Sequence, residues 1–484
     1  MRRKPLAGLS ARVALALALA LGLAGCKAMG PDYHVPPGAA IRAPAAQAPF
    51  REGTGTVTAD PLPPRWWHLY DDPVLDALEE QALAANTDLR VAAASLARAA
   101  SVTAIAEGQK EVDFDAELGA QRARLSAESY LKNETLPVFN LGNATAAMRY
   151  QVDLFGRIRR SIEAAQADEE ASAATIGAVQ VTLAANVARA YIAQCGAAEG
   201  LDLARRTLAL QNKALDSTRR LAEAGRLGAT DVTRAQARVA QAEAALPQWQ
   251  SRSRAALYAL AYLMGRAPAE YPREAERCSA IPQASAALPV GDGAGLLRRR
   301  PDVRIAERQL AAATARIGVA TADLYPRIGL GLSAGSIGLL DDLGKGVANT
   351  WSLGGLIRWS IPGAGARARV HAAKSDADAA LARFDGTVLA ALRETETALS
   401  GYAEDRNRLV ALVRARQAAE QGAQEAARLR AAGRAPLLAD IGERQSALTS
   451  RAAEQAGREA VAQDQVTLFL ALGGGWDSPP HPAP

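Results

Sequence analysis

The chain has little of what enzymes commonly use at an active site. Its 484 residues include only 3 cysteines and 4 histidines, and it contains no HExxH zinc motif and no Walker-type loop. The histidines are scattered, at His34, His68, His371 and His481. Cys195 and Cys278 fit no CxxC or metal-binding spacing, and the sequence does not show whether they pair. We therefore expect a protein that is not an enzyme and that binds no metal and no cofactor.

Aromatic residues are also few, at 5% of the chain, although 49% of the residues are hydrophobic. Alanine is the commonest residue, and such small side chains favour close packing between helices over a bulky globular core. The net charge of +5 is small for this length. No dense run of Lys and Arg occurs, so nucleic acid is not an expected partner.

The N-terminal apolar run, VALALALALGLAG at 13–25, is too short to cross a bilayer as a helix. It follows a basic start, Arg2, Arg3 and Lys4, and ends in LAGC at 23–26, which resembles the bacterial lipoprotein box. In that box the cysteine becomes the first residue of the mature protein and carries acyl chains. The sequence predicts a lipoprotein signal peptide at 1–25, lipidation at Cys26 and delivery to the outer membrane. The alternative is an ordinary signal peptide with an incidental cysteine.

Residues 26–65 are expected to form a lipidated, Pro-rich tether, because eight prolines lie between residues 27 and 65. Such a segment reads as extended chain rather than as a packed element. Regular structure is expected to begin with WWHLYDDPVLDALEEQAL at residue 66. There Asp72 and Pro73 start a helix, Asn86 interrupts it, and Asp88 starts a second helical run.

Four stretches alternate apolar and polar residues with the period of two that is typical of strands. They are VDFDAEL (112–118), NATAAMRYQVDL (143–154), PRIGLGLSAG (326–335) and TWSLGGLIRWSI (350–361). These stretches predict two β-hairpins, 112–154 and 326–361, with strands about as long as those of a transmembrane β-barrel. Lipid tolerates no open sheet edge, and four strands cannot close a barrel, so a trimer with twelve strands is favoured over a dimer with eight. Alternatively, the hairpins cap a water-soluble helical lipoprotein.

Two long helical runs cover about 156–224 and 365–432, each on the order of 100 Å long. Gly225 and Gly433 end them, because glycine takes the positive φ angle with which a helix turns back. Return helices then reach about Leu263 and Leu472, which gives helical hairpins at 156–264 and 365–472.

The same order of elements occurs twice along the chain. Asp88 matches Asp302 at an offset of 214 residues, and Gly225 matches Gly433 at 208. The sequence therefore predicts a tandem repeat of helix, strand, strand, long helix and return helix. The first copy is 66–286 and the second 287–476, with a C-terminal tail at 477–484.

Together these stretches resemble a TolC-like outer membrane factor, of the lipoprotein class that serves resistance–nodulation–division type efflux pumps. The resemblance rests on LAGC, WWHLYDDPVLDALEEQALAANTDLRVA (66–92), AGRLGATDVTRAQ (224–236), RRPDVRIAERQLAAATARIGVATADLYP (299–326) and FLALGGGW (469–476). It implies an α+β membrane protein that forms a homotrimer. A twelve-stranded β-barrel would lie in outer membrane lipid, and a long α-helical barrel in the periplasm. An equatorial layer would come from residues near 74–85, 265–300 and the C-terminus.

The resemblance also implies the activity and the partners. The protein would be the outer membrane channel of a tripartite system, passively conducting substrates that an inner-membrane efflux transporter delivers through a periplasmic adaptor. The alternative is a lipid-anchored periplasmic coiled-coil scaffold without a pore. The sequence identifies neither the substrate nor the particular adaptor and pump.

By resemblance, the turns of the helical hairpins would contact the adaptor and close the periplasmic aperture. The expected adaptor contacts are Gly225, Arg226, Leu227, Gly228, Gly433, Arg434 and Ala435. The aperture candidates are Asp231, Asp440, Glu443, Arg434 and Arg444. Ala439 and Gly442 stand where carboxylates are usual in the family, and Asp440 and Glu443 follow one residue later. The sequence therefore does not decide which acids line the aperture. The other interpretation is that Asp440 and Glu443 are ordinary surface charges.

Overall fold

The computed structural model describes residues 28–52, 57–128, 131, 133–284, 287–361 and 364–476. Cys26, the signal peptide predicted at 1–25 and the tail predicted at 477–484 lie outside these residues. The chain forms two compact units. The first comprises the described part of Met1–Pro36 with Leu96–Ala171 and Ala306–Arg383, and the second the described parts of Pro37–Ser95, Ser172–Ile305 and Phe384–Pro484.

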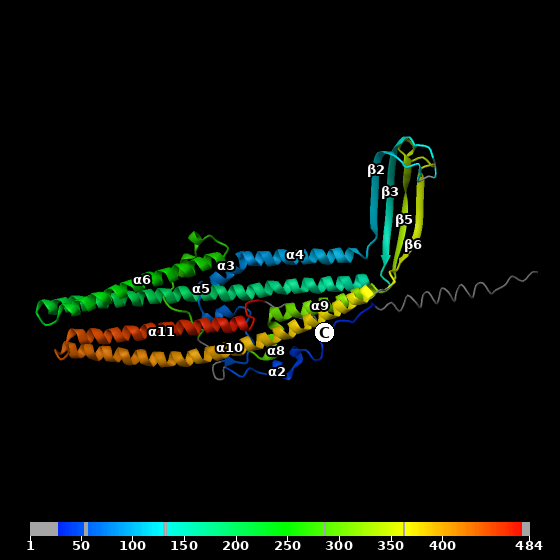
Figure 1. The fold of residues 1–484 in the computed structure, drawn as a ribbon. Helices are drawn as coiled ribbons and strands as arrows, with labels where there is room; N and C mark the ends of the chain where they lie inside the picture. Colours follow the sequence, from blue (N-terminus) through cyan, green and yellow to red (C-terminus); the bar gives the residue numbers. More distant parts are fainter. Residues whose placement is uncertain are drawn as a thin grey trace, which may run out of the picture. The chain divides into compact units, whose positions relative to one another are not determined.

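The first unit is built around a four-stranded antiparallel sheet (Figure 1). Its strands are β2 (Asp113–Arg124), β3 (Val138–Val152), β5 (Arg327–Leu339) and β6 (Asn349–Arg358). They lie in the order β2-β3-β5-β6, so that the two hairpins meet where β3 pairs with β5. β2 and β6 are the edges, and neither pairs with another strand of the described chain on its outer side.

The second unit contains two antiparallel helical hairpins (Figure 1). They are α5 (Arg157–Glu223) with α6 (Ala229–Leu263), and α10 (Ala364–Ala431) with α11 (Leu437–Ala471); α5 and α10 begin in the first unit. The long helices have 67 and 68 residues, and both return helices have 35. At about 1.5 Å per residue, each long helix measures about 100 Å.

Shorter elements complete the fold. The helices are α2 (Pro44–Gln47), α3 (Pro73–Ala85), α4 (Thr87–Gly108), α7 (Arg273–Glu276), α8 (Gly293–Arg299) and α9 (Pro301–Ala322). The strands β1 (Val57–Thr58) and β4 (Leu288–Pro289) pair in parallel. Single 3-10 turns cover Ala40–Arg42, Trp66–Tyr70, Pro268–Glu270 and Leu340–Asp342.

Glycine sets the turn of both helical hairpins in the same way. Gly225 and Gly433 each have a φ angle of 71°. The next amide closes the turn: Arg226 N donates to Leu221 O, and Arg434 N to Leu429 O, each at 2.8 Å. This is the C-terminal capping pattern that favours glycine, because a Cβ atom is strained at positive φ.

Asn86 separates α3 from α4 and joins both to α6. Its backbone N–H ends α3 by donating to Ala82 O, while its side-chain oxygen caps α4 by accepting from Asp88 N at 2.8 Å. The side-chain amide donates to Leu263 O, at the end of α6, at 2.9 Å. One buried residue thus fixes three helix ends, and this explains why the helical pattern breaks there.

The core of the second unit brings together two stretches that lie far apart in the sequence, residues 62–70 and 469–476. Trp66 is fully buried and packs on Phe469 of α11, with ring centroids 4.6 Å apart. A Cβ atom on Gly474 would lie 2.6 Å from Leu62 and 2.7 Å from Trp66, so only glycine fits beside the indole. The stretches WWHLY and FLALGGGW are therefore complementary parts of one core.

Residues 28–52 are packed along their length, which corrects the expectation of an unpacked tether. In the first unit, Arg160 bonds to the Asp32 carboxylate at 2.6 Å and to Met29 O at 3.1 Å. In the second unit, Asp385 accepts from Ala40 N at 2.7 Å and Glu396 from Arg51 N at 3.0 Å. The segment forms only the short helix α2 and one 3-10 turn, and carboxylates of α10 accept hydrogen bonds from its backbone.

Glu79 places an unpaired carboxyl group in the core of the second unit. Its side chain is 0% exposed, and neither carboxyl oxygen has a hydrogen-bond partner among the described residues. Burial, together with nearby Asp76, raises the pKa of Glu79 well above its ordinary value. An unsatisfied buried polar group of this kind costs about 1–3 kcal/mol.

Replacing Glu79 by methionine should therefore raise stability by about 1–3 kcal/mol. Because the folded pKa lies above the unfolded value of about 4.3, the native state binds the proton more tightly. Wild-type stability should then fall as the pH rises from about 4 through the folded pKa, and the Glu79→Met variant should lose this dependence. Thermal unfolding in detergent at pH 5 and pH 8 measures both effects. Glu80→Gln, on a side chain that is 65% exposed, is the matched control. A Met variant less stable than wild type at pH 8 would contradict the account.

Candidate functional site

The sheet of the first unit has one apolar face. Cross-strand pairing places a row of large apolar side chains across all four strands, namely Phe114, Met148, Leu332 and Leu353. The next row is Ala116, Ala146, Ala334 and Trp351. Phe114, Trp351 and Leu353 are 75%, 77% and 74% exposed. A contiguous exposed apolar surface of this kind marks contact with lipid or with another protein.

The opposite face of the sheet is polar. Asp113, Asp115 and Glu117 follow one another on this face of β2. Arg149 of β3 pairs with Asp115, and Asn143 donates to Glu117 at 2.7 Å. Side chains that satisfy one another by hydrogen bonds suit a water-filled interior, which the inner face of a large barrel provides.

Tryptophans bracket the apolar face of β6. Trp351 lies near the loop end of the strand, and Trp359 follows its last residue, on the side that continues to α10. Eight residues of strand span about 26 Å, or about 20 Å of height at a tilt of about 40°. The Trp359 indole donates to Leu324 O at 3.1 Å. Aromatic residues at both ends of an apolar band are typical of transmembrane barrels.

The letters GLSAG at 331–335 match the GxSxG pattern of a hydrolase nucleophile, but the structure excludes that role. A nucleophile elbow needs a turn from strand to helix, whereas Ser333 lies in the middle of β5. Its hydroxyl oxygen is 2.8 Å from that of Ser352, on the neighbouring strand. Among the described residues, no group of three or more His, Cys, Asp and Glu side chains is placed to bind a metal.

Two helical stretches, Pro73–Gly108 and Arg157–Glu223, are long and apolar enough by composition to cross a membrane. Neither is well suited to that task. Asn86 breaks the first, and the second has 67 residues where a span needs about 20. Half of its most apolar window is buried inside the protein. The sheet, rather than these helices, is the better candidate for the membrane-spanning part.

The two helical turns lie at the same end of the second unit (Figure 1). Both turns carry an exposed arginine, Arg226 in the first and Arg434 in the second. The remaining predicted tip residues are in the same turns: Gly225, Leu227 and Gly228 in the first, Gly433 and Ala435 in the second. A cavity of about 380 Å³ is lined by both hairpins, including Asp231 of α6 and Ile441 of α11. The structure thus brings the predicted tip residues of both hairpins to one end.

Asp440 does not stand free at this end. It is 1% exposed, and both its oxygens are bound: Arg430 lies 3.1 Å away and Arg444 2.9 Å away. Burial alone would raise the pKa of Asp440, but the hydrogen bonds from Arg444 and Arg430 outweigh it and lower the pKa below its ordinary value. Arg430 was not predicted, because it lies on α10, across the turn from Asp440.

The other two acids differ in their surroundings. Asp231 caps α6 by accepting from Gly228 N at 3.1 Å, and Arg234 lies 3.6 Å from it. Glu443 is exposed and lies over Gly422 of α10, where an added Cβ atom would be 3.3 Å from a Glu443 oxygen. Of the three predicted acids, Glu443 is the one whose carboxylate is most open to solvent.

Asp440→Ala should loosen the second tip, because it leaves the Arg430 and Arg444 guanidinium groups without their carboxylate. We expect faster amide hydrogen exchange in the last turns of α10 and the first turns of α11. Since the folded pKa of Asp440 is lowered, the wild-type interaction should persist above the unfolded value of about 3.9 and be lost only as the pH falls through the folded pKa. Glu443→Ala, an exposed acid on the same helix, should change exchange little. Equal exchange in the two variants would show that Asp440 holds nothing together.

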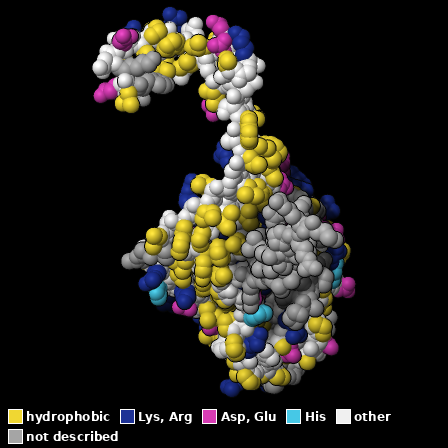
Figure 2. All heavy atoms as spheres, turned by 90° about the vertical axis from the view of Figure 1, so that its right-hand side faces the viewer, with side chains coloured by type: hydrophobic (Ala, Val, Ile, Leu, Met, Phe, Trp, Pro, Cys, Tyr) yellow, Lys and Arg dark blue, Asp and Glu magenta, His cyan; other side chains and the backbone are white. Residues whose placement is uncertain are grey.

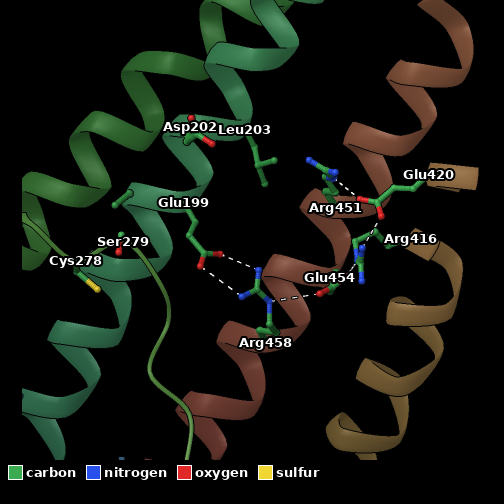
Figure 3. Close-up of a pocket in the computed structure, with 11 residues that line it drawn as sticks. Glu199, Asp202, Leu203, Cys278, Ser279, Arg416, Glu420, Arg451, Glu454 and Arg458 are labelled. Carbon is green, nitrogen blue, oxygen red and sulfur yellow. Dashed lines mark hydrogen bonds and ion pairs between the residues drawn. The ribbon is translucent and has the colours of Figure 1, made fainter. Parts of the chain in front are cut away.

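A polar cleft of about 660 Å³ lies between α5, α10 and α11. Figure 3 shows the ion pairs along it. Arg458 lies 3.1 Å from Glu199 on α5, and Arg416 of α10 pairs with Glu454. The remaining pairs are Arg458–Glu454, Arg416–Glu420 and Arg451–Glu420. Every arginine in this cleft has a carboxylate partner. The ion pairs therefore join the two helical hairpins, and the cleft is not suited to bind a charged ligand.

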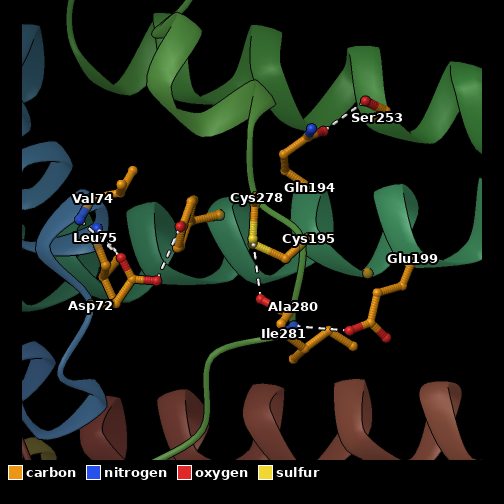
Figure 4. Close-up of a disulfide and its surroundings, with 12 residues drawn as sticks. Asp72, Val74, Leu75, Gln194, Cys195, Glu199, Ser253, Cys278, Ala280 and Ile281 are labelled. Carbon is orange, nitrogen blue, oxygen red and sulfur yellow. Dashed lines mark hydrogen bonds between the residues drawn. A yellow bond between two sulfur atoms is a disulfide. The ribbon is translucent and has the colours of Figure 1, made fainter.

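Cys195 and Cys278 form a disulfide, which the sequence left undecided (Figure 4). Cys195 is fully buried on α5, and Cys278 lies in the segment between α7 and β4. The same segment touches both hairpins: Ile281 N donates to Glu199 at 3.3 Å, and Ala284 N to Gln465 of α11 at 3.4 Å. The disulfide therefore ties a connecting segment to the place where α5 and α11 are already joined.

Cys278→Ser should lower stability by about 2–4 kcal/mol, because the disulfide closes a long loop in the unfolded chain. The two cysteines are 83 residues apart. Thermal unfolding with and without reductant tests this. Reductant should lower the wild-type melting temperature to that of the variant and leave the variant unchanged. Two free thiols in the folded wild-type protein, detected without reductant, would contradict the assignment.

The fold and its surfaces define a class of protein. A four-stranded antiparallel sheet with an exposed apolar face and open edges is combined with helical hairpins whose long helices measure about 100 Å, as in the channels of bacterial outer membranes. The chain belongs to the outer membrane efflux protein family, whose model matches residues 78–266 and 295–474. This match confirms the resemblance to TolC-like outer membrane factors.

Individual relatives agree with the family. The chain is 28% identical over 465 residues to nodulation protein T of Rhizobium leguminosarum bv. trifolii, covering 94% of this chain and 96% of the relative. It is 31% identical over 480 residues to the probable efflux pump outer membrane protein SepC of Pseudomonas putida, covering 96% and 97%. Among solved structures it is similar to the outer-membrane channel OprN, with a TM-score of 0.82, 34% identity and coverage of 93% and 99%.

Proposed function

We propose that the protein is the outer membrane channel of a tripartite efflux system. It passively conducts substrates that an inner-membrane efflux transporter and a periplasmic adaptor deliver, and releases them across the outer membrane. The observation that carries the proposal is the four-stranded sheet, which has an exposed apolar face and two unpaired edges within the described chain. The apolar face of such a sheet is unsuited to water. Its open edges are unsuited to hydrocarbon, because their backbone groups would have no hydrogen-bond partners there.

Closure of the barrel requires a homotrimer. Unpaired backbone groups in hydrocarbon cost several kcal/mol each, so the edge strands must pair with strands of other copies. Two copies give eight strands, whose interior is normally filled by side chains, whereas three give twelve strands and a lumen. Apolar side chains of α4 support contact between copies, because Val91 is 66% and Ile105 71% exposed. The face of the molecule in Figure 2 also carries a broad hydrophobic patch.

The helical hairpins would form the periplasmic α-helical barrel. Their nearly equal lengths and the same φ angle at the glycine of each turn support a tandem repeat, in which each copy contributes one hairpin to the barrel wall. In the proposed assembly the adaptor binds at the turns, where Arg226 and Arg434 are exposed. Glu443 is the acid best placed to face the aperture, whereas Asp440 serves to hold the second tip together.

The N-terminal lipid anchor remains part of the proposal. Acyl chains on Cys26 would hold the protein to the inner leaflet of the outer membrane, in addition to the barrel. The packed segment that begins at Ala28 supports this arrangement. Met29 N donates to Phe155 O at 3.1 Å, at the point where β3 leads into α5. This contact fixes the segment next to the end of the sheet.

Neighbouring residues on β6 allow a test of the membrane face. Leu353 points to the apolar side and Ser352 to the polar side. Leu353→Arg should impair insertion, since a cation on the lipid face costs about 2–4 kcal/mol near the bilayer midplane. Ser352→Arg should insert normally and alter ion selectivity, because its side chain faces the lumen. Heat-modifiable migration of the trimer reports assembly, and conductance in planar bilayers reports the pore.

Two results would contradict the proposed channel or the assignment of its faces. A wild-type protein that is monomeric, stays out of liposomes and conducts no ions would support the alternative, a lipid-anchored periplasmic scaffold without a pore. Equal effects of the two arginine substitutions would show that the faces of β6 are assigned wrongly.

A further inference from the structure

The two edge strands of the sheet carry opposite charges at the same end. β2 begins with Asp113, shortly after α4, and β6 ends with Arg358, shortly before α10. Three antiparallel pairings separate the two strands, so β6 runs opposite to β2. If β6 of one copy lies beside β2 of another, the antiparallel pattern continues, and both charges lie at the end of the sheet that joins the helices.

The charges also share one face. Arg358 is the cross-strand partner of Arg327, next to the apolar pair Ile328 and Ile357, and so it lies on the polar side. Asp113 lies on the polar side of β2, one residue before the apolar Phe114. Both side chains would therefore point into the lumen of a closed barrel rather than into lipid.

Arg358 has a like charge opposite it, and no acid of the described chain forms an ion pair with it. Arg327 and Arg358 face each other directly, an arrangement that is destabilising unless the charges are neutralised. Asp323 neutralises Arg327 at a distance of 2.7 Å. Within the described part of the chain, neither Arg358 nor Asp113 has an ion-pair partner. Among the described residues, Arg358 and Asp113 are thus a cation and an anion without an ion-pair partner, one on each open edge.

We propose that Arg358 on β6 binds the acidic row of β2, namely Asp113, Asp115 and Glu117, on a second copy of this chain. The proposal rests on the trimeric barrel of the proposed function and specifies how its chains recognise one another. Backbone hydrogen bonds would close each seam, and the ion pair would select the partner strand. β6 itself, NTWSLGGLIR, contains no acid, so pairing β6 with another β6 would leave Arg358 without a carboxylate.

The acidic row makes the pairing tolerant of the exact register. A shift of one residue would turn the apolar face of one strand towards the lumen, so only shifts of two residues are allowed. Because the three acids stand at every second position, each of three successive allowed registers puts a carboxylate opposite Arg358. Asp115 and Glu117 already bind Arg149 and Asn143, but a carboxylate can accept further hydrogen bonds.

Engineered disulfides test the seam directly. Arg358→Cys is combined in turn with Asp113→Cys, Asp115→Cys and Glu117→Cys in the full-length protein. Directly opposed residues in antiparallel strands have Cα atoms about 4.5–5.5 Å apart, within the range that a disulfide bridges. We expect one of the three combinations to give covalent trimers on oxidation, which persist in hot SDS without reductant. Arg327→Cys with the same partners is the matched control, because β5 is an inner strand and should give no link between chains.

Charge reversal tests the energetic role. Arg358→Glu should lower the temperature at which the trimer dissociates in SDS, and adding Asp113→Arg should restore part of the loss. If the wild-type protein is a conducting trimer, but no cysteine pair forms links and Arg358→Glu dissociates at the wild-type temperature, the seam proposal is overturned while the channel stands. If the wild-type protein neither forms trimers nor conducts, both proposals fail.

Discussion

The rest of the structure depends on one constraint, that backbone N–H and C=O groups need partners where water is absent. A helix meets this need within itself, whereas a sheet meets it only where each strand has neighbours on both sides. The four strands of this chain meet it at three pairings and leave β2 and β6 open. In the proposed trimer, membrane insertion, pore formation and assembly would be a single event, because the sheet that lipid would cover would be complete only in the oligomer.

In the second unit, long helices with mainly small side chains must be held together. Alanine gives little apolar area per residue, so packing along the hairpins is supplemented by charge. The arginine–glutamate chain joins α5, α10 and α11, and the disulfide fixes the connecting segment beside it. A bulky core is concentrated around Trp66 and Phe469 instead of being spread along the helices. The large buried side chains are therefore concentrated in one region. The helices near the tips pack with fewer large side chains.

Local sequence patterns predicted local structure well. The turns at Gly225 and Gly433, the break at Asn86 and the alternation in each strand all follow from residues within a few positions of one another. Contacts between distant residues were not predictable from the chain. The Cys195–Cys278 bond spans 83 positions, and Arg430 pairs with Asp440 across a turn. The N-terminal segment is bound through its backbone groups, whose partners the residue types do not indicate. The strand count and the need to close a barrel favoured a trimer, whereas the expected partners came from the family resemblance, because no periodicity indicates them.

The position of Asn86 restricts how the second unit can move. Its backbone and side chain bind the end of α3, the start of α4 and the end of α6, and the residue is only 2% exposed. Pulling any one of these helix ends away would strand a desolvated amide, at a cost of about 1–3 kcal/mol. The three helix ends are therefore coupled through Asn86 and should move together.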